Sequence, residues 1–234
     1  MLPVAILAGG LATRLRPVTE TIPKALIDVL GEPFAYHQLR LLRHHGIETV
    51  VFCVGYLGEK IQEVVGDGSR FGLRITYSFD GPKLLGTGGA IRQALPQLGE
   101  KFFVLYGDSY LDIDYRSVEK AYTDSRLPAL MTVFRNEGRW DTSNVEFYNG
   151  HIRKYSKTDR TSSMTHIDYG LGILSEKLFD NISPHSSFDL ASLYGDLADR
   201  RLLAAFEVRQ RFYEVGSFAG IEELCNYLKQ TGAV

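Results

Sequence analysis

Strand-like patterns alternate with helix-like patterns through the first half of the chain. Apolar runs typical of strands covered on both faces occupy residues 4–8, 49–54, 102–106 and 129–134, and an alternating strand pattern occupies 74–78. Helical spacing of apolar residues is found at 34–45, 57–65, 88–95 and 115–125, and Pro96 is expected to stop the third of these helices. This alternation predicts an α/β fold with a Rossmann-like, mostly parallel, mixed sheet and helices on both faces.

The second half of the chain is richer in strand patterns. Asn149-Gly150 is a strong hairpin signal between the strand-like segments 144–148 and 151–155. The polar segment 156–166 is expected to be a mobile loop. The remaining expected elements are a strand at 169–174, a helix at 190–200, a strand at 203–208 and a closing helix at 218–228 that Ser217 would cap. These patterns predict one α/β domain over 1–234, with a β-rich lobe covering one side.

Composition excludes several classes of function. A net charge of −2 argues against a nucleic-acid partner, because such proteins usually carry a basic excess. No apolar segment approaches the roughly 20 residues that span a bilayer, and the N-terminus lacks a secretory signal pattern, so we expect a cytoplasmic protein with no membrane partner. Cys53 and Cys225 are isolated from each other and from metal-ligand spacings, and they predict neither a disulfide framework nor a metal site.

The loop after the first apolar run has the composition of a polyphosphate site. Gly9 and Gly10 let the backbone approach a ligand closely, while Arg14, Arg16 and Lys24 supply positive charge. The segment matches neither the P-loop nor the dinucleotide-binding fingerprint. A turn with solvated basic side chains is the alternative.

Three later turns could add to that site. The glycine-rich turn 85–90 could lie flat against a ring or a phosphate, or it could be only a tight start to a helix. Asp108 follows the buried strand 102–106 and could hold Mg²⁺ at the carboxyl edge of the sheet, or it could cap a turn. Glu214 could complete the metal site, or it could be an ordinary loop carboxylate.

The β-rich lobe carries groups suited to a second, smaller phosphorylated ligand. Lys157 and Asp168 could bind such a ligand, or they could be surface polar residues. None of the six histidines pairs with a cysteine or carboxylate at catalytic spacing, and no nucleophile elbow is present. These observations favour a mechanism without a covalent enzyme intermediate.

Taken in order, these motifs resemble the sugar-1-phosphate nucleotidylyltransferase family. Residues 7–19 read LAGGLATRLRPVT and are followed by Pro23-Lys24, close to the opening signature of that family. The turn LGTGG at 85–89, the pair Gly107-Asp108 and the segment 214–216 match its later motifs. The short length is most similar to the guanylyltransferases of heptose 1-phosphate and mannose 1-phosphate.

The resemblance implies a role for each motif. Arg14 would bind the β- and γ-phosphates of a nucleoside triphosphate, and Lys24 the α-phosphate. Asp108 and Glu214 would bind Mg²⁺. The nucleotide would also lie against Leu7, Ala8, Gly9, Gly10, Thr13, Gly86, Thr87 and Gly88. The sugar 1-phosphate would lie against Asn144, Lys157, Asp168 and Gly170.

The implied reaction transfers a nucleotidyl group, with GMP preferred, to a sugar 1-phosphate for surface polysaccharide or glycoconjugate synthesis. Residues 1 to about 135 would form the nucleotide-binding half, and about 136–234 the sugar-binding and closing half. A homo-oligomer stays open.

Three departures from the family pattern support a different reading of the chain. They are Ala12 in place of a glycine, Glu214 in place of an aspartate, and Ser156-Lys157-Thr158 in place of E-K-P. They keep open a catalytically silent homologue that binds nucleotide and regulates a partner. A second alternative is a cytidylyltransferase acting on phosphocholine, with Trp140, Tyr169 and Asp168 around the choline.

Overall fold

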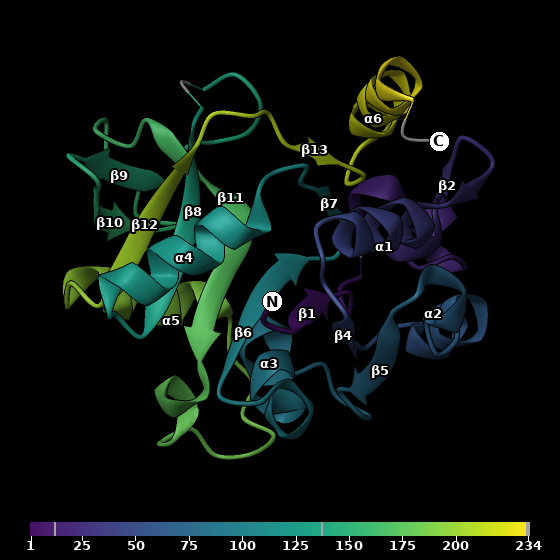
Figure 1. The fold of residues 1–234 in the computed structure, drawn as a ribbon, viewed down its shortest axis with the longest axis horizontal. Coiled ribbons are helices and arrows are strands. Elements are labelled where there is room, and N and C mark those ends of the chain that lie inside the picture. Colours follow the sequence, from purple (N-terminus) through teal and green to yellow (C-terminus); the bar gives the residue numbers. More distant parts are fainter. Residues whose placement is uncertain (12, 137, 233–234) are drawn as a thin grey trace.

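Nine strands of the chain form one mixed sheet in the computed structural model, which describes residues 1–11, 13–136 and 138–232 (Figure 1). The strand order is β10–β9–β11–β6–β1–β4–β5, with β8 pairing β11 and β12 pairing β8. The bounds are β1 Val4–Leu7, β4 Thr49–Val54, β5 Arg74–Phe79, β6 Lys101–Tyr106, β8 Ala129–Arg135, β9 Val145–Tyr148, β10 His151–Tyr155, β11 His166–Ser175 and β12 Leu203–Val208.

The parallel strands β5, β4, β1 and β6 end at nearly the same level. Leu7, the last residue of β1, pairs with Cys53 on β4 and with Tyr106 on β6. The loops that follow these three strands therefore meet at one edge of the sheet. On the other side of β6, β11 runs antiparallel and begins the β-rich lobe, which the β9–β10 hairpin extends.

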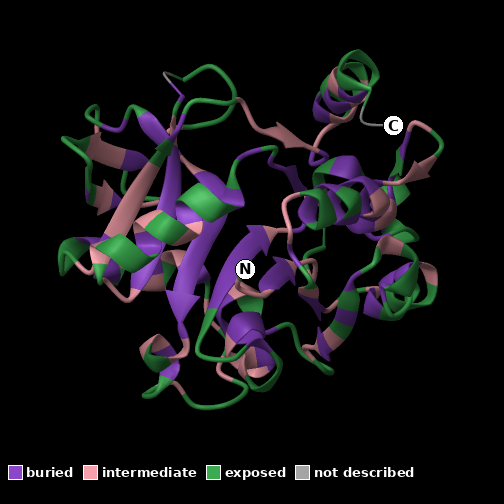
Figure 2. Cartoon of the chain, viewed as in Figure 1, coloured by how far each residue is buried: buried purple, intermediate pink, exposed green. Residues whose placement is uncertain are grey.

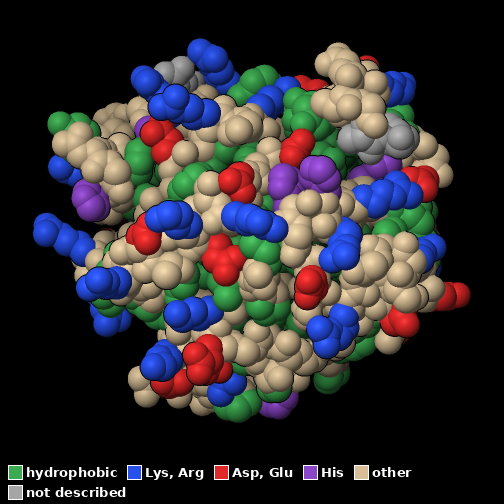
Figure 3. Space-filling view, in the orientation of Figure 1, with side chains coloured by type: hydrophobic (Ala, Val, Ile, Leu, Met, Phe, Trp, Pro, Cys, Tyr) green, Lys and Arg blue, Asp and Glu red, His purple; other side chains and the backbone are tan. Residues whose placement is uncertain are grey.

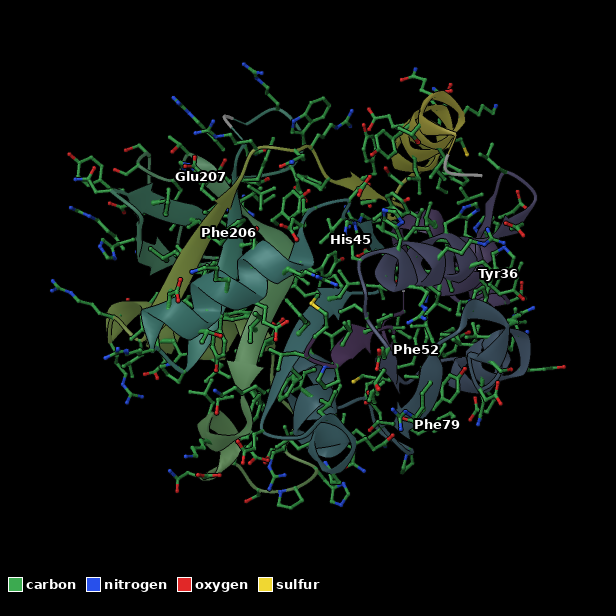
Figure 4. All side chains as sticks on the ribbon, viewed as in Figure 1. Tyr36, His45, Phe52, Phe79, Phe206 and Glu207 are labelled. Carbon is green, nitrogen blue, oxygen red and sulfur yellow. The ribbon has the colours of Figure 1, made fainter. Side chains whose placement is uncertain are left out.

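Helices cover both faces of the sheet, as the sequence predicts. These helices are α1 Phe34–His44, α2 Gly58–Val65, α3 Gly86–Leu98, α4 Tyr115–Ser125 and α5 Leu190–Asp199, and a sixth helix, α6 Phe218–Thr231, closes the chain. Side chains of α1, α2 and α4 share one core with one face of the sheet, which includes Phe52 and Phe79 (Figure 4). Side chains of α3 and α5 share a second core with the opposite face. The central strands are accordingly buried along almost their whole length (Figure 2).

The closing helix α6 lies beside α1 rather than against the main sheet (Figure 1). Leu224 and Leu228 of α6 pack with Phe34 and Leu41 of α1 in a small third core. Two short antiparallel pairs flank this region: β2 Asp28–Val29 with β3 Glu32–Pro33, and β7 Ser109–Tyr110 with β13 Tyr213–Glu214. The β7–β13 pair brings a late segment of the chain next to the residues that follow β6.

The predicted fold class is confirmed, and so is the capping role of Ser217, whose side chain accepts a hydrogen bond from Gly220 N–H. Asp114 caps α4 in the same way, by accepting from Arg116 N–H. The prediction that Pro96 stops its helix was wrong, since α3 continues to Leu98. Pro96 lies in the last turn, where it removes a single intrahelical bond. The buried Leu98 side chain and the Gly99 N–H, which donates to Leu95 O, hold that turn.

The molecular surface carries charges of both signs. Lys and Arg side chains alternate with Asp and Glu side chains over the face shown in Figure 3. Among the described residues, none of the helices combines the length and the apolar character that crossing a bilayer requires.

Candidate active site

A cavity of about 740 Å³ opens at the carboxyl edge of the parallel strands and extends under the β-rich lobe. Fourteen of the sixteen residues that the family resemblance assigns to the site line it: Leu7, Ala8, Gly9, Gly10, Arg14, Lys24, Gly86, Thr87, Asp108, Asn144, Lys157, Asp168, Gly170 and Glu214. Gly88 is not among the described lining residues. Ala12 and the side chain of Thr13 lie outside the described part of the chain.

Close backbone contacts between neighbouring loops shape the strand-edge side of the cavity. Ala8 N–H donates to Cys53 O over 2.9 Å, and Gly107 N–H donates to Leu7 O over 3.0 Å. A Cβ atom added to Gly107 would lie 2.6 Å from Leu7 O, so only glycine fits there. The loop after β1 and the loop after β6 are therefore packed directly together, which sets the position of Asp108.

Lys24 and Asp108 form an ion pair on the cavity wall. The Lys24 Nζ atom lies 2.8 Å from Asp108 Oδ2, and the two side chains are 21% and 28% exposed. Lys24 begins a 3-10 turn, Lys24–Leu26, directly after Pro23. Arg14 lies in another 3-10 turn, Thr13–Leu15, and also reaches the cavity. The strand edge thus presents the two cations Arg14 and Lys24, which are suited to phosphate groups, together with the Asp108 carboxylate.

Glu214 is held close to Asp108 by the β7–β13 pair, because Val215 N–H donates to Asp108 O over 2.9 Å. The Glu214 carboxylate accepts hydrogen bonds from Gly216 N–H and, over 2.9 Å, from Ser217 Oγ. Both predicted metal ligands therefore line the cavity, and each already has a protein partner. Among the described residues, no group of three or more His, Cys, Asp and Glu side chains is arranged to hold a metal ion.

The glycine-rich turn packs against a late segment of the chain. Cβ atoms added to Gly88 and Gly89 would lie 2.2 Å from the Phe188 ring and 2.2 Å from Ser186 O. These two glycines are thus needed for packing, as the tight-turn alternative holds, whereas Gly86 lines the cavity. The Thr87 hydroxyl donates to Asp189 Oδ1 over 3.1 Å and accepts from Leu190 N–H over 2.8 Å. Thr87 therefore joins the turn to the start of α5.

Asp168 lies at the centre of a hydrogen-bond network in the lobe. Its carboxylate accepts from Tyr106 OH over 2.9 Å, from Tyr155 OH over 3.5 Å and from Gly170 N–H over 3.0 Å. The Asn144 side-chain oxygen accepts from Asp168 N–H over 2.9 Å. Burial raises the pKa of Asp168 above its usual value, and these donors oppose that shift in part. The predicted residues Asn144, Asp168 and Gly170 are therefore in direct contact.

Lys157 completes the lobe side of the cavity. Its Nζ atom lies 3.6 Å from Asp189 Oδ1 and 5.9 Å from the centre of the Tyr106 ring. Arg160, further along the same loop, also lines the cavity. Positive charge is thus present on the lobe side as well as on the strand edge.

Sequence reasoning missed the cavity residues Asp80, Asp141 and Arg160. It also missed Asp189, which pairs with the cavity residue Lys157. Asp80 had the same signal as Asp108, since it directly follows a parallel strand, β5. Its carboxylate accepts from Leu85 N–H over 3.1 Å, and burial raises its pKa. Asp141 and Asp189 carry no comparable sequence signal, because their place depends on how distant loops fold together.

Comparison with known proteins identifies the family. Residues 4–143 match the model of the family described as "Nucleotidyl transferase". The chain is 31% identical over 216 residues to a UTP–glucose-1-phosphate uridylyltransferase of Synechocystis, covering 84% of this chain and 55% of that protein. It is 30% identical over 183 residues to a D-glycero-alpha-D-manno-heptose 1-phosphate guanylyltransferase of Campylobacter jejuni, covering 78% and 80%.

A solved structure shares the fold. HddC from Yersinia pseudotuberculosis, complexed with GMP-PN, superposes with a TM-score of 0.80 at 24% identity, over 97% of this chain and 100% of that one. The chain spans between about half and two thirds of the length of the first curated relatives that it matches. Since the family model matches more than half of the chain, and a relative of similar length agrees, the protein belongs to the nucleotidyl transferase family.

Proposed function

We propose that the protein transfers a nucleotidyl group from a nucleoside triphosphate, with GTP preferred, to a sugar 1-phosphate and releases pyrophosphate. The observation that carries the proposal is one cavity with positive charge on two sides. Arg14 and Lys24 lie on the strand edge, and Lys157 and Arg160 lie on the lobe. Two anionic substrates brought together need this arrangement, because their mutual repulsion must be offset.

Each side of the cavity would hold one substrate. The triphosphate would lie along Arg14 and Lys24, with its nucleoside against Leu7, Ala8, Gly9 and Gly86. The sugar phosphate would bind Lys157, and its hydroxyl groups would meet the Asn144, Asp168 and Gly170 network. Residues 1 to about 135 would then be the nucleotide half and about 136–234 the sugar half. Surface polysaccharide or glycoconjugate synthesis is the process we expect to use the product.

Mg²⁺ fits the carboxylates on the cavity wall. Asp108 and Glu214 offer hard oxygen ligands on adjacent backbone segments, and Mg²⁺ commonly uses one or two carboxylates together with substrate phosphates. When bound, the metal would neutralise charge on the phosphate oxygens. The Lys24 ammonium would then leave Asp108 to contact the α-phosphate.

The transfer itself needs no general base. An oxygen of the sugar phosphate, already ionised at neutral pH, forms a bond to the α-phosphorus of the triphosphate. The bond between that phosphorus and the bridging oxygen breaks, and pyrophosphate carries away the electron pair. Positioning and stabilisation of charge would supply the acceleration, with Arg14 and Lys24 as the principal groups.

Pyrophosphate release tests the proposal. The protein would be incubated with Mg²⁺ and each of the four common nucleoside triphosphates against glucose, mannose and heptose 1-phosphates. We expect release with at least one pair, with the highest rate for GTP, and none when the acceptor is omitted. If every pair fails to release pyrophosphate, the proposal is wrong.

One observation favours a second function, a silent homologue that binds nucleotide. The Glu214 carboxylate caps its own turn, and a metal would have to displace the bonds from Gly216 N–H and Ser217 Oγ. Calorimetry separates the two functions, because the silent homologue would bind GTP or a nucleotide sugar without turnover. Phosphocholine is disfavoured, since the Arg211 guanidinium beside the Trp140 ring is a permanent cation that would repel a choline there.

A further inference from the structure

Trp140 is an exposed aromatic side chain on the wall of the cavity. It is the single tryptophan of the chain, it is 44% exposed, and it lines the cavity from the loop between β8 and β9. The neighbouring residues Asp141 and Thr142 line the cavity too. An exposed ring of this size in a ligand cavity, flanked by hydrogen-bonding side chains, is a typical surface for a ligand with both apolar and polar faces.

Buried hydrogen bonds hold the loop that carries Trp140. The Asn136 side chain is fully buried, and its oxygen accepts from Trp140 N–H over 3.2 Å. Its amide nitrogen donates to Asp141 O and, over 3.2 Å, to Ser143 Oγ. Asn136 N–H in turn donates to Thr165 O over 3.1 Å. A single buried amide thus sets the backbone on both sides of Trp140.

Arg211 holds the ring itself. The centre of its guanidinium lies 3.5 Å from the centre of the Trp140 ring, which is stacking distance. Arg211 also forms an ion pair with Glu223 of α6, and its carbonyl accepts from Tyr169 OH over 3.4 Å. The indole is therefore fixed by a residue that is itself anchored to the closing helix and to the lobe.

The charge of Arg211 restricts what Trp140 can bind. A permanent cation on the ring reduces its attraction for a second cation, which argues against a quaternary ammonium ligand. A neutral sugar ring meets no such repulsion, because it offers C–H groups to the aromatic surface and hydroxyl groups to the polar neighbours. Asp141 and Thr142 are placed to accept or donate to those hydroxyl groups along the same wall.

We propose that Trp140 is the stacking surface for the sugar ring of the acceptor, and that Arg211 is a positioning residue that acts through it. This inference rests on the proposed function, since it assumes a sugar phosphate in the lobe side of the cavity. It goes further by naming the side chain that selects a ring-shaped, uncharged acceptor body.

Intrinsic fluorescence tests the contact without turnover. Because Trp140 is the single tryptophan, selectively excited tryptophan emission reports on its surroundings alone. Titration with glucose, mannose and heptose 1-phosphates should give a saturable change in emission with at least one of them. Inorganic phosphate should give none, and neither should phosphocholine. If no sugar phosphate changes the emission, or if inorganic phosphate changes it equally, the inference is wrong.

Kinetics of variants separate this inference from the proposed function. In Trp140→Ala the KM for the sugar 1-phosphate should rise about tenfold, equivalent to about 1.4 kcal/mol, while the KM for the nucleotide stays unchanged. The KM of Trp140→Phe for the sugar 1-phosphate should lie between those of the wild-type protein and Trp140→Ala. An active Trp140→Ala variant with an unchanged acceptor KM contradicts the inference and leaves the proposed function standing. A wild-type protein without any turnover contradicts the proposed function instead.

A matched aromatic pair provides the control. Tyr148 is 56% exposed with the Arg153 guanidinium 4.7 Å from its ring centre, and neither residue is among the described residues that line the cavity. Tyr148→Ala should leave both KM values unchanged.

Arg211→Met should shift the tryptophan emission of the free protein and raise the acceptor KM, and Arg211→Lys should restore part of both. Arg211→Met with wild-type emission and KM would contradict the positioning role.

Discussion

The Lys24 ammonium lies 2.8 Å from the Asp108 carboxylate, so the proposed phosphate-binding cation and the proposed metal ligand neutralise each other before substrates arrive. Lys24 comes from a turn near the N-terminus and Asp108 from the edge of β6. Binding of a triphosphate with Mg²⁺ would replace this ion pair by two others. Lys24 would pair with a phosphate group, and Asp108 would pair with the metal.

Loss of Lys24 should therefore have opposite effects on turnover and on metal binding. In Lys24→Ala we expect turnover to fall by about 100-fold, the scale of losing one electrostatic group in a transition state. The free protein should bind Mn²⁺ more tightly, since Asp108 no longer has a competing cation. Pyrophosphate release and calorimetry measure the two effects, with Lys120→Ala, which changes an exposed side chain on α4, as control. Wild-type turnover would refute the role of Lys24.

Replacement of Asp108 by asparagine should lower turnover and also weaken metal binding. The amide keeps the size of the side chain but removes the charge that would hold a divalent cation. We expect turnover to fall by at least about 100-fold and Mn²⁺ binding to weaken. A variant that keeps both properties would show that Asp108 serves the turn alone.

The contact between Gly88 and Phe188 predicts that Gly88→Ala destabilises the protein when the Phe188 ring is present and stabilises it when the ring is removed. Gly88→Ala should destabilise the protein by about 1–3 kcal/mol, because the new methyl group would overlap the Phe188 ring. In a Phe188→Ala background the same change should stabilise by up to about 1 kcal/mol, since alanine is the better helix former. Urea unfolding of the four proteins measures the cycle. Equal effects in both backgrounds would contradict the packing role.

The contribution of Asp168 to the free energy of unfolding should fall as pH rises. Burial raises its pKa in the folded protein, so between about pH 4, where it titrates in the unfolded chain, and its folded pKa, the folded state binds more protons. The contribution of Asp168 to stability is then present at low pH and is lost as pH rises through the folded pKa. Asp168→Asn removes this dependence. The wild-type advantage over the variant in urea unfolding should therefore shrink from about pH 4 upward, and a growing advantage would contradict it.

Asp189 should contribute to stability mainly as a helix cap. Its carboxylate accepts from Ala191 N–H over 2.8 Å at the start of α5, besides its contact with Thr87. Asp189→Ala should cost about 1 kcal/mol, while Asp189→Asn should keep most of that stability. Asp114→Ala, at the equivalent position of α4, should cost a similar amount and serves as the reference. Thermal or urea unfolding measures all three variants.

Local pattern was sufficient for most of the fold and for part of the site. Buried apolar runs and helical spacing predicted the order of strands and helices. The rule that ligands bind at the carboxyl ends of parallel strands predicted that Asp108 lies at the site. The end of α3 was predicted wrongly because burial of Leu98, a tertiary effect, outweighs the local effect of Pro96. Partnerships such as Gly88 with Phe188, or Trp140 with Arg211, join residues far apart in the sequence. No local pattern carries them, since they depend on how the lobe closes over the sheet.

The two-residue pairing of β7 with β13 has a consequence for synthesis on the ribosome. Asp108 leaves the ribosome long before Glu214, yet Val215 N–H must reach Asp108 O before the two carboxylates can face one ligand. A nascent chain of which only the parallel strands have left the ribosome would already contain the loop that is proposed to bind phosphate. It would still lack the second carboxylate, Glu214. In the proposed function, the pair of carboxylates for the metal would therefore be completed late, together with α6.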